Sequence, residues 1–477
     1  MSATAGGQSQ NYDLTVIGGG PGGYTAAIRA ARLGARVALV ERDELGGTCT
    51  NWGCIPTKAM QYSAEVYHEN QERGAELGVM VSGLEVDFAR LMAHKDKVVK
   101  QLTGGLAQLM KAHKIDVHRG HGTLVAPGKV RVKLNQGGAT EFATQKTILA
   151  TGSAVAKPPI EGLDLPGVID SNGAVSLTEL PASMVLIGGG IIGVEFGSIF
   201  AALGTKVTIV EMLPRLMPGM DEELARRAVP NLKRLGCEVV LGAAVKKITQ
   251  SGDKQLTVAY TVNDKPATAS GEKVLVATGR VPFHQDAVAE GLRLATGRRE
   301  ITIGKDYQTN IPNVWAIGDA VGGVLLAHKA MDEGEVAAFL AMTGRSPHRV
   351  NYGVIPSPVF ALPELAGVGL PEEEARQKYK KVKTAKIPFG AIGRAVAMGQ
   401  TNGFAKMICD EETGEVLGVH IMGPRATDLI AEPALAMAME YTAEEIAATI
   451  HAHPTLPEAI HEAALAQTVG PIHVFNA

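Results

Sequence analysis

The sequence has few cysteines, no long apolar run and no strong excess of either charge. Four cysteines in 477 residues are too few for the disulfide framework of a small secreted protein. A formal net charge of -3 without a basic run gives no reason to expect nucleic acid as a partner. No apolar stretch approaches the roughly 20 residues of a membrane-spanning helix. These absences leave a cytoplasmic enzyme, with no insertion into a membrane, as the expectation.

The N-terminal sequence MSATAGGQSQ contains neither a basic residue nor an apolar core. We therefore expect a short disordered tail there, and not a signal or transit peptide. The length of the chain suggests about three domains, and 45% hydrophobic residues suffice for large cores. Glycine is abundant at 56 residues, which suits tight turns and close contact between backbone and phosphate.

The first chemical pattern is a glycine loop between a strand and a helix. Residues 12–17 form an apolar strand pattern, and after the loop come a helix pattern through Leu33 and a strand at 36–40 that ends in Glu41. The loop has the G-x-G-x-x-G spacing, with Gly18, Gly20 and Gly23. Such glycines let the backbone approach a pyrophosphate at the helix N-terminus, while a terminal acid accepts from a ribose hydroxyl. The order predicts a dinucleotide-binding domain; the alternative for Glu41 is an exposed strand end.

The same pattern recurs in the middle of the chain. A strand pattern at 183–187, a helix pattern and a strand at 206–210 that ends in Glu211 surround a second loop. This loop repeats the spacing with Gly188, Gly190 and Gly193. Such an internal repeat predicts two dinucleotide sites, unless one domain has lost its ligand.

Cys49 and Cys54 follow directly on the first nucleotide-binding pattern. In a regular helix their spacing would hold them too far apart for a disulfide, but Gly53 permits a local distortion. The pair is a structural disulfide, two unpaired buried thiols or a redox dithiol. The neighbouring nucleotide site favours the redox dithiol. A structural disulfide is less favoured, because one that closes so short a loop adds little stability. Cys237 and Cys409 stand alone and are expected to be buried thiols.

The position of the dithiol assigns ligands to the two sites. A flavin accepts electrons from thiolates and exchanges hydride with nicotinamide, so FAD is expected at the first site and a nicotinamide nucleotide at the second. Glu211 favours NAD over NADP because a carboxylate repels a 2′-phosphate. Arg215 lies close enough in sequence to soften that preference.

The rest of the chain suggests four segments. A strand that ends at residue 150 leads into the turn Thr151-Gly152-Ser153, and a strand that ends at residue 276 leads into the turn at Thr278-Gly279. A third strand ends at Asp319 and is followed by a helix that begins at Ala327. After a linker at 346–352 comes a region of mixed strands and helices without a glycine loop, which predicts an α+β module. We expect a first domain at 1–155, a second at 156–283, a return to the first at 284–352 and a third domain at 353–477.

His453 is the candidate base for the dithiol. Imidazole has a suitable proton affinity to activate a thiol, and Glu458 is close enough in sequence to orient it. Two other interpretations stay open. Thr455 and Glu458 have the spacing of a helix capping box, and His453 is otherwise an ordinary loop histidine.

The segments GGTCTNWGCIPTK and HPTLPE resemble the active-site segments of the flavin-dependent pyridine nucleotide–disulfide oxidoreductases. The resemblance extends from about residue 11 to the end of the chain. It implies an α/β fold with two Rossmann-like domains, one for FAD and one for NAD, and a C-terminal α+β interface domain that forms a homodimer. It also implies a cis bond between His453 and Pro454. The chain departs from the family at Phe360-Ala361, where Tyr-Thr is common.

The resemblance implies that the enzyme oxidises the dihydrolipoyl groups of a separate carrier protein with NAD+, within 2-oxo acid dehydrogenase or glycine cleavage complexes. Cys49 would attack the substrate, Cys54 would face the flavin, Lys58 would pair with Glu195, and His453 with Glu458 would serve as base. FAD would be bound by Gly18, Gly20, Gly23, Glu41, Thr48, Lys58, Gly122, Thr151, Gly152, Ser153, Asp319 and Ala327. NAD would be bound by Gly188, Gly190, Gly193, Glu195, Glu211, Val245 and Gly279. No metal site is implied. Another NAD(P)H-dependent disulfide reductase of this family, or a chiefly structural subunit of such a complex, is the alternative.

Overall fold

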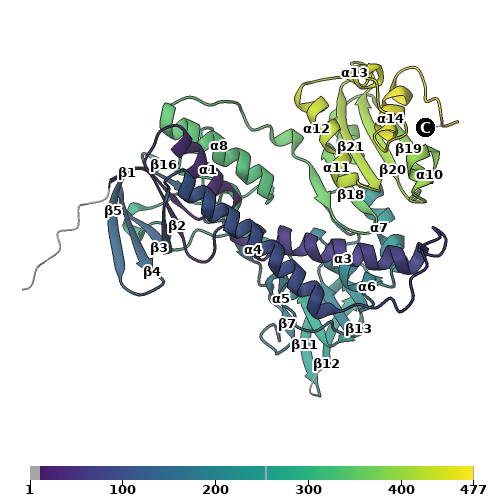
Figure 1. Ribbon diagram of the computed structural model, residues 1–477, viewed down its shortest axis with the longest axis horizontal. Coiled ribbons are helices and arrows are strands. Elements are labelled where there is room, and N and C mark those ends of the chain that lie inside the picture. The colour runs from purple at the N-terminus through teal and green to yellow at the C-terminus, as the bar shows by residue number, and fades with distance from the viewer. Residues whose placement is uncertain (1–10, 253–254, 476–477) are drawn as a thin grey trace, which may run out of the picture. The chain divides into compact units, whose positions relative to one another are not determined.

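The computed structural model describes residues 11–252 and 255–475, so the tail expected at residues 1–10 lies outside the described residues. The chain divides into two compact units, drawn in Figure 1. The first unit runs to residue 59 and includes 92–157 and 279–350. The second consists of 60–91, 158–278 and 351–477. No helix within the described ranges is long and apolar enough to cross a membrane.

The first unit is built on a six-stranded sheet. Its strands are β1 (Asn11–Ile17), β2 (Val37–Glu41), β3 (Asp116–Ala126), β4 (Lys129–Leu134), β5 (Ala139–Leu149) and β16 (Val314–Ala316). Strand β1 pairs in parallel with β2 and β5, while β4 pairs antiparallel with β3 and β5. The helices α1 (Pro21–Arg32) and α8 (Ala327–Thr343) lie side by side (Figure 1) and contribute alanines to the core.

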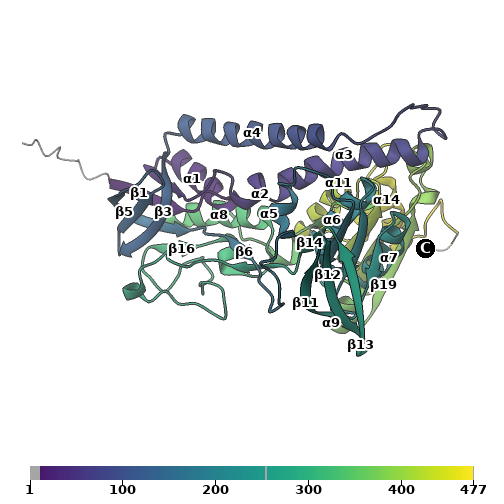
Figure 2. The same ribbon diagram turned by 90° about the horizontal axis from the view of Figure 1, so that it is seen from below.

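The second unit contains a five-stranded parallel sheet in the order β10-β9-β8-β14-β7. These strands are β7 (Val168–Ile169), β8 (Ser183–Ile187), β9 (Lys206–Val210), β10 (Glu238–Val240) and β14 (Lys273–Val276), and the helices are α5 (Ser171–Ala174), α6 (Ile191–Ala202) and α7 (Glu222–Arg234). An antiparallel meander, β11 (Ala243–Ser251), β12 (Gln255–Val262) and β13 (Lys265–Gly271), stands beside it (Figure 2).

The two glycine patterns fold in the same way. The backbone N–H of Gly18 donates to Val40 at 2.8 Å, and that of Gly188 donates to Val210 at 2.9 Å. A Cβ on Gly23 would lie 1.8 Å from the oxygen of Gly18, and one on Gly193 would lie 2.0 Å from the oxygen of Gly188. Glycine is therefore required at Gly23 and Gly193, where the first turn of each helix packs against the backbone at the start of its loop.

The C-terminal part of the second unit is an antiparallel sheet covered by short helices (Figure 1). The strand order is β17 (Ser357–Val359), β18 (Glu364–Gly369), β21 (Val416–Gly423), β20 (Phe404–Asp410) and β19 (Val382–Pro388). The helices are α9 (Glu372–Lys378), α10 (Gly393–Ala397), α11 (Ala426–Leu429), α12 (Ala431–Ala438), α13 (Ala443–Ala448) and α14 (Glu458–Gln467). Their buried side chains form one apolar core with the sheet.

Two helices are notable for their bounds. Helices α11 and α12 are separate, because Pro433 has no N–H to continue one helical ladder through both. Helix α3 (Cys54–Arg73) begins at the second cysteine of the candidate dithiol. The family fold class, α/β with an α+β C-terminal part, is confirmed. The boundaries expected at residues 155, 283 and 352 stay predictions.

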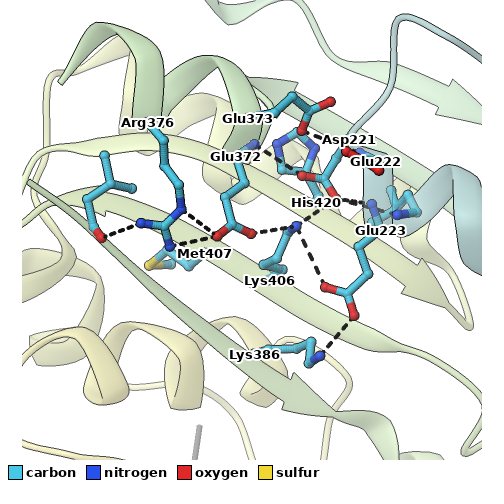
Figure 3. Close-up of polar contacts among 12 residues, drawn as sticks. Asp221, Glu222, Glu223, Glu372, Glu373, Arg376, Lys386, Lys406, Met407 and His420 are labelled. Carbon is cyan, nitrogen blue, oxygen red and sulfur yellow. Dashed lines mark hydrogen bonds and ion pairs between the residues drawn. The ribbon is translucent and has the colours of Figure 1, made fainter.

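A buried ionic cluster joins the parallel and antiparallel parts of the second unit (Figure 3). Lys406 on β20 has a side chain only 2% exposed, and its Nζ lies 2.6 Å from Asp221 Oδ1, 3.2 Å from Glu372 Oε2 and 3.7 Å from Glu223 Oε2. Asp221 also caps α7 by accepting from Glu223 and Leu224. Burial opposes the charge of Asp221, but His420 and Lys406 outweigh it, so its pKa is lowered.

Candidate active site

The first glycine loop leaves an open cradle at the N-terminus of α1. Gly20 is the N-cap of α1 and has no capping side chain. A Cβ on Gly20 would come no nearer to any atom than 4.0 Å, to the Cα of Gly47. The free N–H groups of the first turn therefore border open space, which fits the pyrophosphate of a dinucleotide.

Glu41 closes this loop from the end of β2. Its Oε2 accepts from Gly19 N at 2.6 Å and its Oε1 accepts from Asp43 N at 2.7 Å. Burial raises the pKa of Glu41 in spite of these two donors. Because the carboxylate is fixed at the strand end, it is a suitable acceptor for a ribose hydroxyl.

The second loop repeats the arrangement. A Cβ on Gly190, the N-cap of α6, would meet nothing within 4 Å. Glu211 accepts from Gly189 N at 2.5 Å and from Leu213 N at 2.7 Å. Arg215, which the sequence placed near this site, forms an ion pair with Glu373 at 3.1 Å and donates to Pro218 O at 2.7 Å. Its guanidinium is thus occupied by partners within the second unit.

The two candidate redox cysteines meet where α2 (Gly47–Asn51) ends and α3 begins. Both are thiols in this structure, and a hydrogen bond joins their side chains. This bond and burial raise the pKa of Cys49, against the opposing effects of the Cys54 N–H and the Lys58 charge. The pKa of Cys49 is thus raised within the dithiol, while Cys54 is the first residue of a helix, a position that favours a thiolate.

A chain of hydrogen bonds connects the dithiol segment with Asp319 in the first unit. Ser153 Oγ donates to Asp319 Oδ2 at 2.5 Å. Arg280 donates to Ser153 Oγ at 2.8 Å and to Ser153 O at 2.7 Å, and it reaches Thr48 Oγ1 at 3.4 Å. The expected cofactor residues Thr48, Ser153 and Asp319 are therefore brought together by Arg280, which no sequence pattern had indicated.

A buried ion pair supports the backbone around Asp319. Lys329 and Glu333 on α8 lie 3.1 Å apart with side chains 2% and 1% exposed. Glu333 accepts from Gly318 N at 2.7 Å, and Lys329 donates to the carbonyls of Gly318 and Gly322. The pair holds both ends of the short helix η2 (Gly318–Val321) that carries Asp319.

The other expected cofactor residues lie in different surroundings. Thr151 donates to Phe283 O at 2.5 Å, and Ala327 is the first residue of α8. Gly122 on β3 is a packing position, since a Cβ there would lie 2.8 Å from Val40 Cγ1. Gly152 and Gly279 both have positive φ, and Val245 lies on β11.

Lys58 and Glu195 belong to different units, so the pair expected between them stays a prediction. Within the second unit, Glu195 on α6 is buried, and its Oε1 accepts from Phe360 N at 2.9 Å. This bond ties α6 to the segment where the chain departs from the common Tyr-Thr of the family.

His453 and Glu458 do meet. His453 Nδ1 lies 2.8 Å from Glu458 Oε1, and the imidazole is 77% exposed. Glu458 Oε2 accepts from Thr455 N at 2.8 Å. The capping box considered for Thr455 and Glu458 is nevertheless not formed, because α14 begins at Glu458 itself, its N-cap is Pro457, and Thr455 Oγ1 donates to Ala452 O instead. Partial burial raises the pKa of Glu458, but the bonds from His453 and Thr455 and the positive charges of His453 and His473 lower it further. The bond between His453 and Pro454 is cis, as the resemblance implied.

Two residues around these groups, Tyr24 and Arg280, were not predicted from the sequence. Tyr24 directly follows Gly23, and its pKa is raised by burial and then by the charges of Cys49 and Cys54. Arg280 directly follows Gly279. Each of the two residues directly follows a glycine that was predicted to bind a cofactor, and this position in the sequence was the only signal for it. Across the residues that the structure describes, no group of three or more His, Cys, Asp or Glu is arranged to hold a metal ion.

Two family descriptions match the chain. "Pyridine nucleotide-disulphide oxidoreductase" matches residues 12–334, and the dimerisation domain of the same family matches 355–464. The dihydrolipoyl dehydrogenase of Geobacillus stearothermophilus is 43% identical over 472 residues, which cover 97% of this chain and 98% of the relative. Dihydrolipoyl dehydrogenase 3 of Pseudomonas putida is 41% identical over 459 residues, covering 96% and 98%.

Among solved structures, the Cu(II) complex of the HOCl-induced flavoprotein disulfide reductase RclA of Escherichia coli matches with a TM-score of 0.85. The identity is 30%, and the match covers 95% of this chain and 99% of that one. Sequence and structural similarity therefore agree along nearly the whole length.

Proposed function

The chain belongs to the pyridine nucleotide–disulphide oxidoreductase family, and from that premise we propose that it oxidises dihydrolipoamide to lipoamide with reduction of NAD+ to NADH. The observation that carries this proposal is the similarity, along nearly the whole chain, to dihydrolipoyl dehydrogenases. The adjacent thiols of Cys49 and Cys54 and the His453–Glu458 pair provide the groups that such a reaction needs.

The reaction has two halves, and each of them transfers one pair of electrons. In the first, a substrate thiolate attacks Cys49 of the Cys49–Cys54 disulfide, the second substrate thiol displaces Cys49, and lipoamide leaves with the enzyme as a dithiol. In the second, the dithiol returns to the disulfide while NAD+ becomes NADH and a proton is released. Bound FAD supplies the link between the two, since a flavin takes electrons from thiolates and passes hydride to nicotinamide. In the proposed scheme the proton of the dithiol is on Cys49 and the charge is on Cys54, at the start of α3.

His453 acts as the base that makes the substrate thiolate. Its Nδ1 is held by Glu458, which leaves Nε2 to accept the substrate proton, and the carboxylate stabilises the resulting imidazolium. The dimerisation domain indicates a homodimer, and the base of each subunit is proposed to serve the dithiol of its partner.

The cofactors of the family are FAD and NAD. The open cradle at Gly20, with Glu41 fixed beside it, fits the pyrophosphate and ribose of FAD. The corresponding elements at Gly190 and Glu211 fit NAD. We assign the remaining FAD contacts to Gly18, Gly23, Thr48, Lys58, Gly122, Thr151, Gly152, Ser153, Asp319 and Ala327. The remaining NAD contacts are assigned to Gly188, Gly193, Glu195, Val245 and Gly279.

The physiological substrate is proposed to be a dihydrolipoyl group on a separate carrier protein, within a 2-oxo acid dehydrogenase or glycine cleavage complex. A cytoplasmic location is also proposed. The two lone cysteines, Cys237 and Cys409, are buried thiols, which suits a reducing compartment.

The structural match to a flavoprotein disulfide reductase favours one alternative, reduction of another disulfide with NADH or NADPH. A second alternative is a chiefly structural subunit. A purely structural protein does not need a thiol for disulfide exchange or an imidazole held by a carboxylate. A Cys49→Ser variant that still assembles with its complex but is inactive would separate the catalytic role from the structural one.

The test is steady-state reduction of NAD+ and of NADP+ by dihydrolipoamide, with the flavin absorbance recorded. Fast reduction of NAD+ with little reduction of NADP+ is expected, and Cys54→Ser should retain FAD but lose this turnover. A protein whose flavin is reduced by NADH but which leaves dihydrolipoamide unoxidised would refute the substrate and favour the disulfide reductase alternative.

A further inference from the structure

The candidate base His453 lies on the loop between α13, which ends at Ala448, and α14, which begins at Glu458 (Figure 1). Within residues 449–455, all of which the structure describes, only His451 and Thr455 are partly buried, and the others are exposed. The imidazole of His453 itself is 77% exposed. The neighbouring side chains therefore have to fix the backbone that carries the base.

Three contacts hold the imidazole of His451, two residues before the base. Its Nδ1 lies 2.9 Å from Thr449 O, and its Nε2 lies 2.7 Å from Glu432 Oε1 on α12. The ring also stacks on that of His461 on α14, with the centroids 4.7 Å apart and 22° between the planes. The side chain of His451 is only 7% exposed. One side chain thus connects the loop to α12 and to α14.

The surroundings of His451 are in turn bonded to α13. His461 Nε2 lies 3.0 Å from Ala447 O, near the end of that helix. Thr449 Oγ1 donates to Glu445 O at 2.8 Å, which fastens the start of the loop to the same helix. Because its partners lie on or next to three helices, the imidazole of His451 has a fixed position.

The other end of the loop is fixed by Thr455 and Glu458. The carboxylate of Glu458 contacts His453 Nδ1 and accepts from Thr455 N, each at 2.8 Å. Thr455 Oγ1 also donates to Ala452 O at 2.7 Å. His453 therefore lies between two anchors, with His451 before it and the contacts of Thr455 after it.

We propose that His451 is a positioning residue for the base. Its contacts with Glu432 and His461 hold the loop in the place from which His453 Nε2 can reach the substrate thiol. A general base has to lie within hydrogen-bonding reach of the proton that it accepts, and misplacement by about 1 Å can lower a rate about a hundredfold. Glu458 orients the ring of His453, but the backbone decides where that ring is. This inference rests on the proposed role of His453 in dihydrolipoamide oxidation.

The test compares His451→Ala with His451→Gln in the holoenzyme. The alanine variant removes all three contacts, so kcat for dihydrolipoamide should fall about tenfold to a hundredfold. KM should change less than about twofold, because the imidazole of His453 acts on the reacting proton. Glutamine has an amide Nε2 that can donate to Glu432, so this variant should regain most of the lost kcat. Oxidation of NADH by ferricyanide, which needs no thiol proton, should be unchanged in both variants.

Thr442→Ala is the matched control for stability. It removes the capping box at the start of α13, which costs about 1 kcal/mol, but it leaves the three contacts of His451 in place. Its thermal midpoint should fall while kcat stays unchanged. Equal kcat in the wild type and His451→Ala would overturn the inference. So would a parallel loss of the ferricyanide activity, or an equal loss of kcat in Thr442→Ala, since either would mean that the effect is one of general stability.

A crystal structure of His451→Ala adds a readout that does not depend on the substrate. Residues 450–453 should be displaced or should occupy more than one conformation, whereas in Thr442→Ala they should keep their place. An unmoved His453 in His451→Ala would overturn the inference. A wild type that does not oxidise dihydrolipoamide at all would instead refute the proposed function.

Discussion

Lys406 Nζ lies 2.6 Å from Asp221 Oδ1 in the interior of the second unit, where their side chains are 2% and 0% exposed (Figure 3). The pair joins β20 of the antiparallel sheet to the cap of α7, which belongs to the nucleotide-binding part. Two further carboxylates, on Glu372 and Glu223, surround the same ammonium. Glu372 also pairs with Arg376, and Glu223 also pairs with Lys386. Lys406 is therefore the ammonium partner of the fully buried Asp221, shared with two less buried carboxylates.

We expect Lys406→Met to destabilise the second unit by about 3–5 kcal/mol, because it leaves the buried carboxylate of Asp221 without its ammonium partner. Lys386→Met is the matched control, since Lys386 also contacts Glu223, at 2.9 Å, but is 43% exposed. The control should change stability by less than about 1 kcal/mol. Thermal unfolding of both variants measures the difference, and equal midpoints would show that the cluster contributes little.

The same cluster predicts a loss of stability in acid. The pKa of Asp221 is lowered, since His420 and Lys406 outweigh its burial, and that of Glu372 is lowered by Arg376 and Lys406 against its own burial. A carboxyl with a lowered folded pKa contributes stability above its unfolded pKa of about 4 and loses it as the pH falls through the folded value. The midpoints of the wild type and Lys406→Met should therefore converge between about pH 5 and pH 3. A constant gap would contradict the linkage.

Short sequence patterns correctly predicted those features of the structure that depend only on residues close together in the chain. The glycine loops, with Glu41 and Glu211 at their strand ends, are set by the strand and helix beside them, and the structure has them at the expected positions. The capping pattern at Thr455 and Glu458 was the wrong interpretation, because α14 begins at Glu458 and has Pro457 as its N-cap. The carboxylate of Glu458 contacts His453 and the backbone N–H of Thr455.

Contacts between distant segments could not be predicted in this way. Ser153 meets Asp319, and Lys406 meets Asp221, only because separate strands and helices are packed together. No local periodicity or spacing encodes such pairs. Lys406 itself lies in a strand pattern, where a lysine is ordinarily expected on the exposed face.

The preference for NAD should depend on Glu211 and, through Arg215, on Glu373. Glu211→Gln removes the charge that repels a 2′-phosphate, so the ratio of kcat/KM for NAD+ over NADP+ should fall at least about tenfold. Adding Glu373→Gln frees Arg215 from its 3.1 Å ion pair and should lower the ratio further. Glu374→Gln, whose partner Lys378 is exposed, is the control and should leave it unchanged. An unaltered ratio in Glu211→Gln would refute the role of this carboxylate.

Arg280 should be needed to retain FAD. Arg280→Lys cannot reproduce the two bonds to Ser153 together with the reach to Thr48. Loss of hydrogen bonds of this kind costs about 1.5–3 kcal/mol, so the affinity for FAD should fall roughly tenfold to a hundredfold. Arg42→Lys is the control, because Arg42 is 53% exposed and pairs with its neighbour Asp43. FAD release during dialysis, followed by absorbance, checks this, and equal retention in both variants would rule it out.

The hydrogen bond between the two thiols predicts which one carries the charge. In Cys49→Ser the remaining thiol, Cys54, starts α3 and should form its thiolate at lower pH than Cys49 does in Cys54→Ser. In Cys54→Ser, Cys49 loses its hydrogen bond to the Cys54 thiol, but burial still raises the pKa of Cys49. The pH dependence of alkylation by iodoacetamide measures the order. Cys237 and Cys409 set a low background, because burial raises the pKa of each to about 12. The reverse order would mean that Cys49 holds the charge of the dithiol, and that the roles proposed for the two cysteines must be exchanged.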